Sequence, residues 1–127
     1  MNIPRKAIEN IYRLAVAVHQ KQLSRQDAVA DAFQQGGMSE ASAQNFIYNL
    51  PHMLAGDEYK RAMSIGATEY FLRGIYSDFG LESFRMAVAS VRNHIEYYGS
   101  KRQGSCQPSM TKMIQRLEEE YAVEYMR

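Results

Sequence analysis

Cysteine is nearly absent from this chain, and long hydrophobic runs are missing. Cys106 is the one cysteine among 127 residues, so no disulfide can form within the chain. A single free thiol is typical of a reducing compartment, and we therefore expect a cytoplasmic location. The apolar run near the N-terminus, residues 14–18, is too short for a signal peptide or a membrane span, so no membrane association is expected.

An excess of charge of either sign is also missing. The chain has 15 Lys and Arg against 14 Asp and Glu, which gives a formal net charge of +1. Without bulk positive charge, any contact with nucleic acid must come from a local basic patch. The length, together with 46% hydrophobic residues, predicts one compact globular domain rather than two.

The residue patterns of familiar catalytic and metal centres are absent as well. His19, His52 and His94 are scattered, and neither a His-x-x-x-His nor a Cys-x-x-Cys pair occurs. Phosphate-binding and dinucleotide-binding glycine motifs are missing, and Cys106 lacks the surroundings of a nucleophile. We expect His94 to be a packing histidine and the acidic run at 118–120 to be a solvated helix face. The sequence therefore predicts no catalytic residue, no metal site and no cofactor.

What the chain does contain is a series of apolar residues at helical spacing, with no convincing strand. This pattern predicts an all-α fold, a compact single-domain bundle of about six helices. We expect helices at residues 4–21, 24–35, 39–55, 64–79, 81–98, and from 109 or 111 to 127. Within the domain, 24–56 is a helix-turn-helix-like element, 64–99 a helical core and 109–127 the C-terminal helix.

Small polar residues and glycines set the expected ends of these helices. Ser24 and Ser39 can each cap a helix N-terminus, because a serine hydroxyl accepts a hydrogen bond from an early backbone amide. Gly36 and Gly37 can end the second helix, because glycine readily adopts the left-handed conformation. Gly99 is expected to stop the fifth helix.

Three further residues predict local packing. Phe33 falls on the expected core face of the second helix. Pro51 removes a backbone donor, which predicts a kink or an early stop in the third helix before the final break at Gly56. Gly74 lies inside the fourth helix at a cost of roughly 1 kcal/mol relative to alanine, so close packing against a neighbour is expected there.

The outer face of the third helix has an unusual composition. Gln44, Asn45, Tyr48 and Asn49 are hydrogen-bonding side chains without formal charge, whereas a purely solvated face usually carries Lys and Glu. Such side chains suit the recognition of an edge that displays both donors and acceptors, such as a base in the major groove. The sequence therefore predicts that these four residues read bases in duplex DNA.

A helix-turn-helix motif would explain this arrangement. Gly37 opens the turn, Met38 fills the core, Ser39 caps the reading helix, and apolar residues follow at 43 and 46. The match is imperfect, because Ala32 lies five residues before Gly37 instead of four. An ordinary helical hairpin with a glycine stop is the open alternative.

Basic residues in the second half of the chain are candidates for phosphate contacts. Phosphate contacts position a protein on DNA without reading its sequence. The candidates are Lys60, Arg61, Arg85, Arg92, Lys101 and Arg102. The alternative is that they are merely solvated.

The aromatic residues offer a second mode of contact. Tyr48, Tyr59, Tyr97 and Tyr98 are the tyrosines that we expect at the surface, where they could stack on an extruded base. The alternative is that these residues, like most aromatics at helical spacing, belong to the core.

Four segments carry a resemblance to a known family. Residues 42–50, 67–72, 76–81 and 94–98 resemble the helical N-terminal domains that precede HNH nuclease domains in McrA-like, modification-dependent restriction endonucleases. The resemblance implies a DNA-recognition domain, possible reading of a modified base, and a nuclease domain or subunit as partner in restriction-modification or phage defence. The chain lacks an HNH motif, and Pro51 departs from the family.

A protein–protein interaction module is the main alternative function. Enrichment in Tyr and Met is typical of such surfaces, and a phage or mobile-element regulator that docks on a bacterial complex would fit. The last helix could also form a homodimer through Ile114, Leu117, Tyr121 and Tyr125. An enzyme with an unrecognised pocket is the third alternative, with perturbed histidine titration as its sign.

Overall fold

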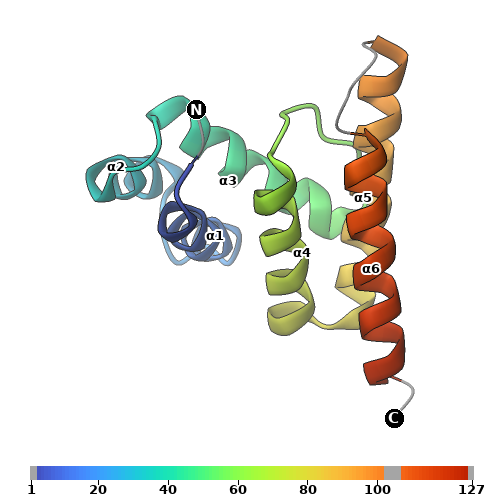
Figure 1. Cartoon of the computed structure of the whole chain (residues 1–127). Coiled ribbons are helices and arrows are strands. Elements are labelled where there is room, and N and C mark those ends of the chain that lie inside the picture. Colours follow the sequence, from blue (N-terminus) through green and yellow to red (C-terminus); the bar gives the residue numbers. More distant parts are fainter. Residues whose placement is uncertain (1–2, 102–106, 126–127) are drawn as a thin grey trace.

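The computed structural model describes residues 3–101 and 107–125, and these residues fold into helices joined by short connections (Figure 1). No strand occurs among them. The predicted all-α class and the predicted number of helices are confirmed. In chain order the helices are α1 (Arg5–His19), α2 (Arg25–Gln35), α3 (Glu40–Ala55), α4 (Ile65–Phe79), α5 (Leu81–Lys101) and α6 (Gln107–Tyr125).

The third helix, α3, connects the two ends of the fold. It packs against α1 and α2 as well as against α5, while α4 packs against α1 and α5. The last helix, α6, lies along α4 and α5. Figure 1 shows α1 and α2 at one end of the molecule and α4, α5 and α6 at the other. One continuous hydrophobic cluster contains buried residues from all six helices.

Serine residues determine where three of the helices begin. Ser24, Ser39 and Ser64 each accept a hydrogen bond through Oγ from the backbone amide three residues later, at 3.0–3.1 Å. Each such cap stabilises a helix by about 1 kcal/mol. The expected caps at Ser24 and Ser39, and the expected start near Ser64, are confirmed.

Glycines end α2 and α3, whereas the proline in α3 does not interrupt it. Gly36 and Gly37 have positive φ values of 84° and 88°, and Gly56 ends α3 with a φ of 76°. The early stop expected at Pro51 is wrong, because α3 continues to Ala55. Pro51 is exposed, so its ring lies on the outer side of α3 and does not disturb the core.

The junction between α5 and α6 also differs from expectation. Helix α5 continues through Gly99 to Lys101, so the predicted stop at Gly99 is wrong. A glycine inside a helix costs about 1 kcal/mol relative to alanine, which does not by itself end a helix. Helix α6 begins at Gln107, before either start that was expected. Residues 102–106 of the expected loop lie outside the described residues.

Close packing joins α4 to α1 at Gly74, as predicted. A Cβ atom on Gly74 would lie 2.5 Å from Cζ of Tyr12, so no larger residue fits without movement. The Tyr12 ring packs edge-on against Phe71, with centroids 5.2 Å apart. Its hydroxyl donates to Oδ2 of Asp78 at 2.8 Å. Burial and this hydrogen bond both raise the pKa of Tyr12, so the phenol remains a donor.

Buried side chains hold α6 against the rest of the chain. Ile114, Leu117 and Tyr121 are buried, and the Tyr121 ring stacks on Tyr76 with centroids 3.9 Å apart. The predicted homodimer surface is therefore wrong for these three residues, because the chain's own core already covers them. The side chain of Tyr125 lies outside the described residues.

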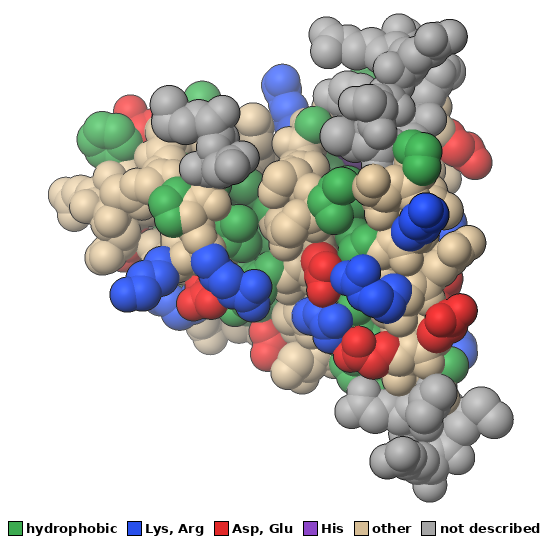
Figure 2. Space-filling model, viewed as in Figure 1, with side chains coloured by type: hydrophobic (Ala, Val, Ile, Leu, Met, Phe, Trp, Pro, Cys, Tyr) green, Lys and Arg blue, Asp and Glu red, His purple; other side chains and the backbone are tan. Residues whose placement is uncertain are grey.

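Ion pairs add a second set of contacts between α4 and α6. Arg73 pairs with Glu120 at 2.7 Å and with Glu69 at 3.0 Å, and Arg116 pairs with Glu69 at 2.8 Å. Figure 2 shows Lys and Arg side chains beside Asp and Glu side chains over these helices. The acidic run of α6 was expected to be a solvated face, but Glu118 and Glu120 also form ion pairs with other helices. Exposed pairs of this kind add little to stability, because water screens their charges.

One predicted core residue lies at the surface. The side chain of Phe33 is 56% exposed, so its expected place in the core is wrong. The neighbouring residues Ala28, Val29 and Ala32 bury the inner face of α2, and Phe33 lies beyond that face.

The helices that the structure describes were compared with the requirements for spanning a membrane. None of them combines the length and the apolar composition needed to span a bilayer.

Candidate nucleic-acid interface

The outer face of α3 carries three of the four side chains predicted to read bases. Gln44 is exposed, Asn45 is partly exposed, and the Tyr48 side chain is 44% exposed. These positions lie within one turn or so of each other, so the helix brings their side chains to neighbouring parts of its surface. Neither amide makes a hydrogen bond within the described part of the chain. Both therefore keep a donor and an acceptor available for a ligand.

The fourth predicted base-reading residue, Asn49, is not at the surface. Its side chain is 0% exposed, and Nδ2 donates to the carbonyl oxygen of Arg61 at 2.9 Å. The prediction that Asn49 reads a base is therefore wrong. The burial of Asn49 could have been predicted from the helical period, because Asn49 shares a face with buried Phe46 and Met53.

The hydrogen bond from Asn49 belongs to a set that fixes the linker between α3 and α4. Three buried polar side chains contact alternate carbonyl oxygens of this linker. Ser90 Oγ donates to the carbonyl oxygen of Asp57, and His94 Nδ1 lies 2.5 Å from that of Tyr59. Asn49 donates to the carbonyl oxygen of Arg61. In an extended backbone, alternate carbonyls point to the same side. Three polar side chains from α3 and α5 thus hold the linker extended across both helices.

His94 is the central member of this set. It is 6% exposed, so the prediction of a packing histidine is confirmed. Its ring stacks on Tyr59, with centroids 4.2 Å apart and planes 9° apart. Burial lowers the pKa of His94, while the hydrogen bond to the Tyr59 carbonyl and the charge of Glu58 oppose this shift. The neutral ring that results donates from Nδ1 to the linker.

The linker carries two exposed cations. Lys60 and Arg61 are exposed, and the ammonium of Lys60 lies 5.4 Å from the centre of the Tyr97 ring. The carbonyl of Arg61 is bonded to Asn49, one turn along α3 from Asn45. The backbone of Arg61 is thus fixed next to the exposed polar face of α3.

Tyr59 differs from the surface tyrosine that was expected. It is only 1% exposed, and burial raises the pKa of its hydroxyl. The expectation of an exposed stacking residue is therefore wrong for Tyr59, whose ring instead packs the linker against His94. Tyr97 is partly exposed, and the side chain of Tyr98 lies outside the described residues.

The six predicted phosphate contacts do not share one face. Arg92 donates to both carboxylate oxygens of Glu118 on α6, at 2.8 and 3.1 Å. Ser90 and His94 each lie two residues from Arg92 and face the linker, so Arg92 points to nearly the opposite side of α5. Arg85 lines the same groove as Arg92 and Glu118.

Among the predicted basic residues whose side chains are described, only Lys60 and Arg61 lie on the linker that packs against α3. Arg102 lies outside the described residues, and of Lys101 only the backbone, at the end of α5, is described. Helix α5 separates Arg85 and Arg92 from the linker.

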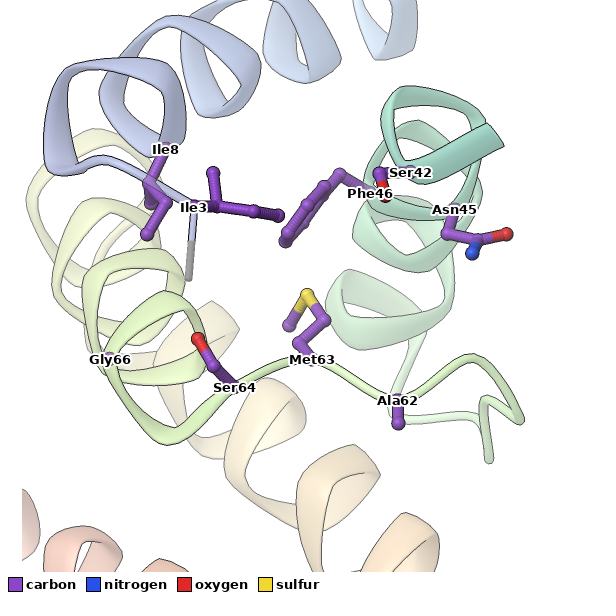
Figure 3. Close-up of a pocket in the computed structure, with 9 residues that line it drawn as sticks. All are labelled: Ile3, Ile8, Ser42, Asn45, Phe46, Ala62, Met63, Ser64 and Gly66. Atoms are coloured by element: carbon purple, nitrogen blue, oxygen red, sulfur yellow. The ribbon is translucent and has the colours of Figure 1, made fainter. Parts of the chain in front are cut away.

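A cavity of about 440 Å³ opens next to the polar face of α3. Figure 3 shows Ile3, Phe46 and Met63 gathered at its centre, and Asn45 directed away from them. The remaining polar groups are the hydroxyls of Ser42 and Ser64, which already bond within helix caps. The walls are thus largely apolar, and the free amide of Asn45 lies on the solvent side.

The chemistry available at this interface is hydrogen bonding, stacking and charge contact. The described residues contain no group of three His, Cys, Asp or Glu side chains that could hold a metal ion. Free amides, an exposed aromatic ring and two neighbouring cations are groups that bind nucleic acids. No family model, curated protein or solved structure matches this chain, so its function is inferred from this geometry.

Proposed function

We propose that this chain is a DNA-binding module that supplies recognition and no chemistry. One observation carries the proposal: the free amides of Gln44 and Asn45 lie on α3 near a linker with two exposed cations, and Asn49 of α3 anchors the backbone of one of them, Arg61. Amide side chains recognise base edges, while Lys and Arg contact phosphates. The lone free cysteine favours action in the cytoplasm.

The roles divide between the helix and the linker. Gln44, Asn45 and Tyr48 contact bases, and Lys60 and Arg61 contact the phosphate backbone. Anchored cations lose less conformational freedom on binding than cations on a free loop, which favours affinity.

A restriction-type role follows from the resemblance to the N-terminal domains of McrA-like endonucleases. In that role, a nuclease domain or subunit cuts the DNA that this chain recognises, as part of restriction-modification or phage defence. A modified base is then a candidate target, and the amides of α3 are the groups that would distinguish it.

Fluorescence anisotropy with labelled DNA, single-stranded and duplex, tests the proposal. The double variant Lys60→Ala/Arg61→Ala should weaken binding to all sequences alike, by about tenfold for each lost charge-assisted contact. A matched control, Arg85→Ala/Lys112→Ala, removes the same charge from exposed positions on α5 and α6. It should bind like the unmodified chain. Equal losses in both double variants would show nonspecific attraction, and absence of binding to any DNA would refute the proposal.

A protein-docking module is the second candidate, and the exposure of Phe33 favours it. An aromatic side chain that is 56% exposed on α2 is the kind of group that anchors protein interfaces. Binding to a protein through such a surface changes little with salt, whereas binding through phosphates weakens steeply. If Phe33→Ala abolished a salt-insensitive complex while DNA binding was absent, this candidate would replace the first.

A further inference from the structure

The charges around α3 favour one DNA strand over two. In a helix-turn-helix complex, the recognition helix lies in the major groove and the preceding helix crosses the phosphate backbone. Here the preceding helix is α2, which carries Asp27 and Asp31 against one cation, Arg25, and α3 itself begins with Glu40. These two helix segments thus offer three carboxylates against one cation, while Lys60 and Arg61 serve only one backbone.

An exposed aromatic ring stands where one base can reach it. The Tyr48 side chain is 44% exposed, and its ring lies 4.4 Å from the ring of His52, tilted by 56°. Contact with His52 restrains the Tyr48 ring, so little freedom is lost when a base stacks on it. Bases offer a stacking face to a protein only when they are unpaired or extruded.

The amides beside this ring can also form hydrogen bonds with an unpaired base. Gln44 and Asn45 each lie three or four residues before Tyr48, so all three side chains project from adjacent turns of α3. In a duplex, the Watson–Crick edge of a base is occupied by its partner. An unpaired base stacked on Tyr48 presents that edge to amides that have both a donor and an acceptor free.

From these observations we infer that the chain binds single-stranded DNA, with one unpaired base stacked on Tyr48 and the strand's phosphates along Lys60 and Arg61. This inference rests on the proposed function and specifies the form of DNA that the site takes. It departs from the duplex reading that the helix-turn-helix pattern predicts, because the cations lie on a single flank of α3.

The test uses one oligonucleotide of about 12 nucleotides as a single strand and annealed to its complement, with 2-aminopurine at one position in turn. The single strand should bind more tightly than the duplex, and binding should quench 2-aminopurine at one position. Tyr48→Ala should remove the quenching and weaken single-strand binding by about 5- to 150-fold, the range for loss of one base–aromatic stack. Tyr48→Phe keeps the ring and should retain both signals.

Phe33→Ala is the matched control, because it removes another exposed aromatic ring from a different helix. It should leave single-strand affinity unchanged. Tighter binding to the duplex, or an equal loss for both forms in Tyr48→Ala, would overturn the single-strand inference and leave the proposed function standing. If neither form bound the unmodified chain, the proposed function would fall as well.

Discussion

Two asparagines on α3, four residues apart, have opposite environments. Asn45 is partly exposed, and its amide makes no hydrogen bond within the described part of the chain. Asn49 is fully buried and donates to the carbonyl of Arg61. The same side chain thus stays available to a ligand at one position and holds the linker at the other, because Asn49 and not Asn45 bonds to the linker.

This contrast predicts different effects for the same substitution. Asn49→Ala leaves a carbonyl of the linker without its partner, so the free energy of unfolding should fall by about 1–3 kcal/mol. Asn45→Ala should change it by less than about 0.5 kcal/mol while reducing the preference among DNA sequences. Urea unfolding of both variants measures the free energy of unfolding, and fluorescence anisotropy measures the preference among DNA sequences. Equal loss of stability in the two would contradict the assigned roles.

The buried position of His94 predicts a pH dependence of stability. Burial lowers its pKa in the folded chain, whereas the unfolded chain has the ordinary value of about 6.5. Below that value, the unfolded chain binds a proton that the folded chain does not. The free energy of unfolding should therefore fall as pH decreases, by at most about 1.4 kcal/mol per pH unit, until the folded pKa is reached.

Urea unfolding across this pH range measures the effect, and His94→Gln is the control. Glutamine can still donate to the carbonyl of Tyr59 but does not titrate. The part of the slope that belongs to His94 should disappear in this variant. A slope that persisted unchanged would assign the pH dependence to other groups.

At the scale of the helices, two glycines in α4 have opposite surroundings. Gly74 faces the ring of Tyr12, whereas a Cβ on Gly66 would meet no atom within 4 Å. Gly74→Ala should therefore destabilise the chain by about 1–3 kcal/mol through overpacking, which exceeds the gain in helix propensity. Gly66→Ala should be neutral or stabilise the chain by up to about 1 kcal/mol.

Thermal unfolding of the two variants separates packing from propensity. The midpoint should fall for Gly74→Ala and stay or rise for Gly66→Ala. A rise of the unfolding temperature in both variants would contradict the close contact between Gly74 and Tyr12.

The sequence allows the helices to be predicted better than their ends. Local hydrogen bonds determine helix starts, so Ser24 and Ser39 could be recognised as caps from the sequence alone. Pro51 and Gly99 are weak helix residues, yet α3 and α5 continue through them, because tertiary packing of a whole helix can outweigh the propensity of one residue.

The candidate site is less predictable for the same reason. Exposure of Gln44 and Tyr48 follows from the helical period, whereas the linker contacts of Asn49 and the pairing of Arg92 with Glu118 join residues far apart in sequence. The burial of Tyr59 depends on His94, which lies 35 residues later. Such contacts cannot be read from spacing within one helix.

At the scale of the whole molecule, the distribution of charge limits the strength of the proposed DNA binding. The net charge is +1, and Arg73, Arg92 and Arg116 are engaged in ion pairs between helices. Affinity that rests on two cations beside α3 should be modest and should depend moderately on salt. Such a moderate salt dependence would distinguish this chain from DNA-binding proteins that neutralise many phosphates.

The salt dependence of single-strand binding tests this account most directly. Anisotropy titrations between about 50 and 200 mM salt give the slope of log affinity against log salt for the unmodified chain and for Lys60→Ala/Arg61→Ala. Two phosphate contacts on a single strand predict that the slope falls in magnitude by about 1.4 in the double variant. A slope that the double variant left unchanged would contradict the placement of the DNA backbone along this linker.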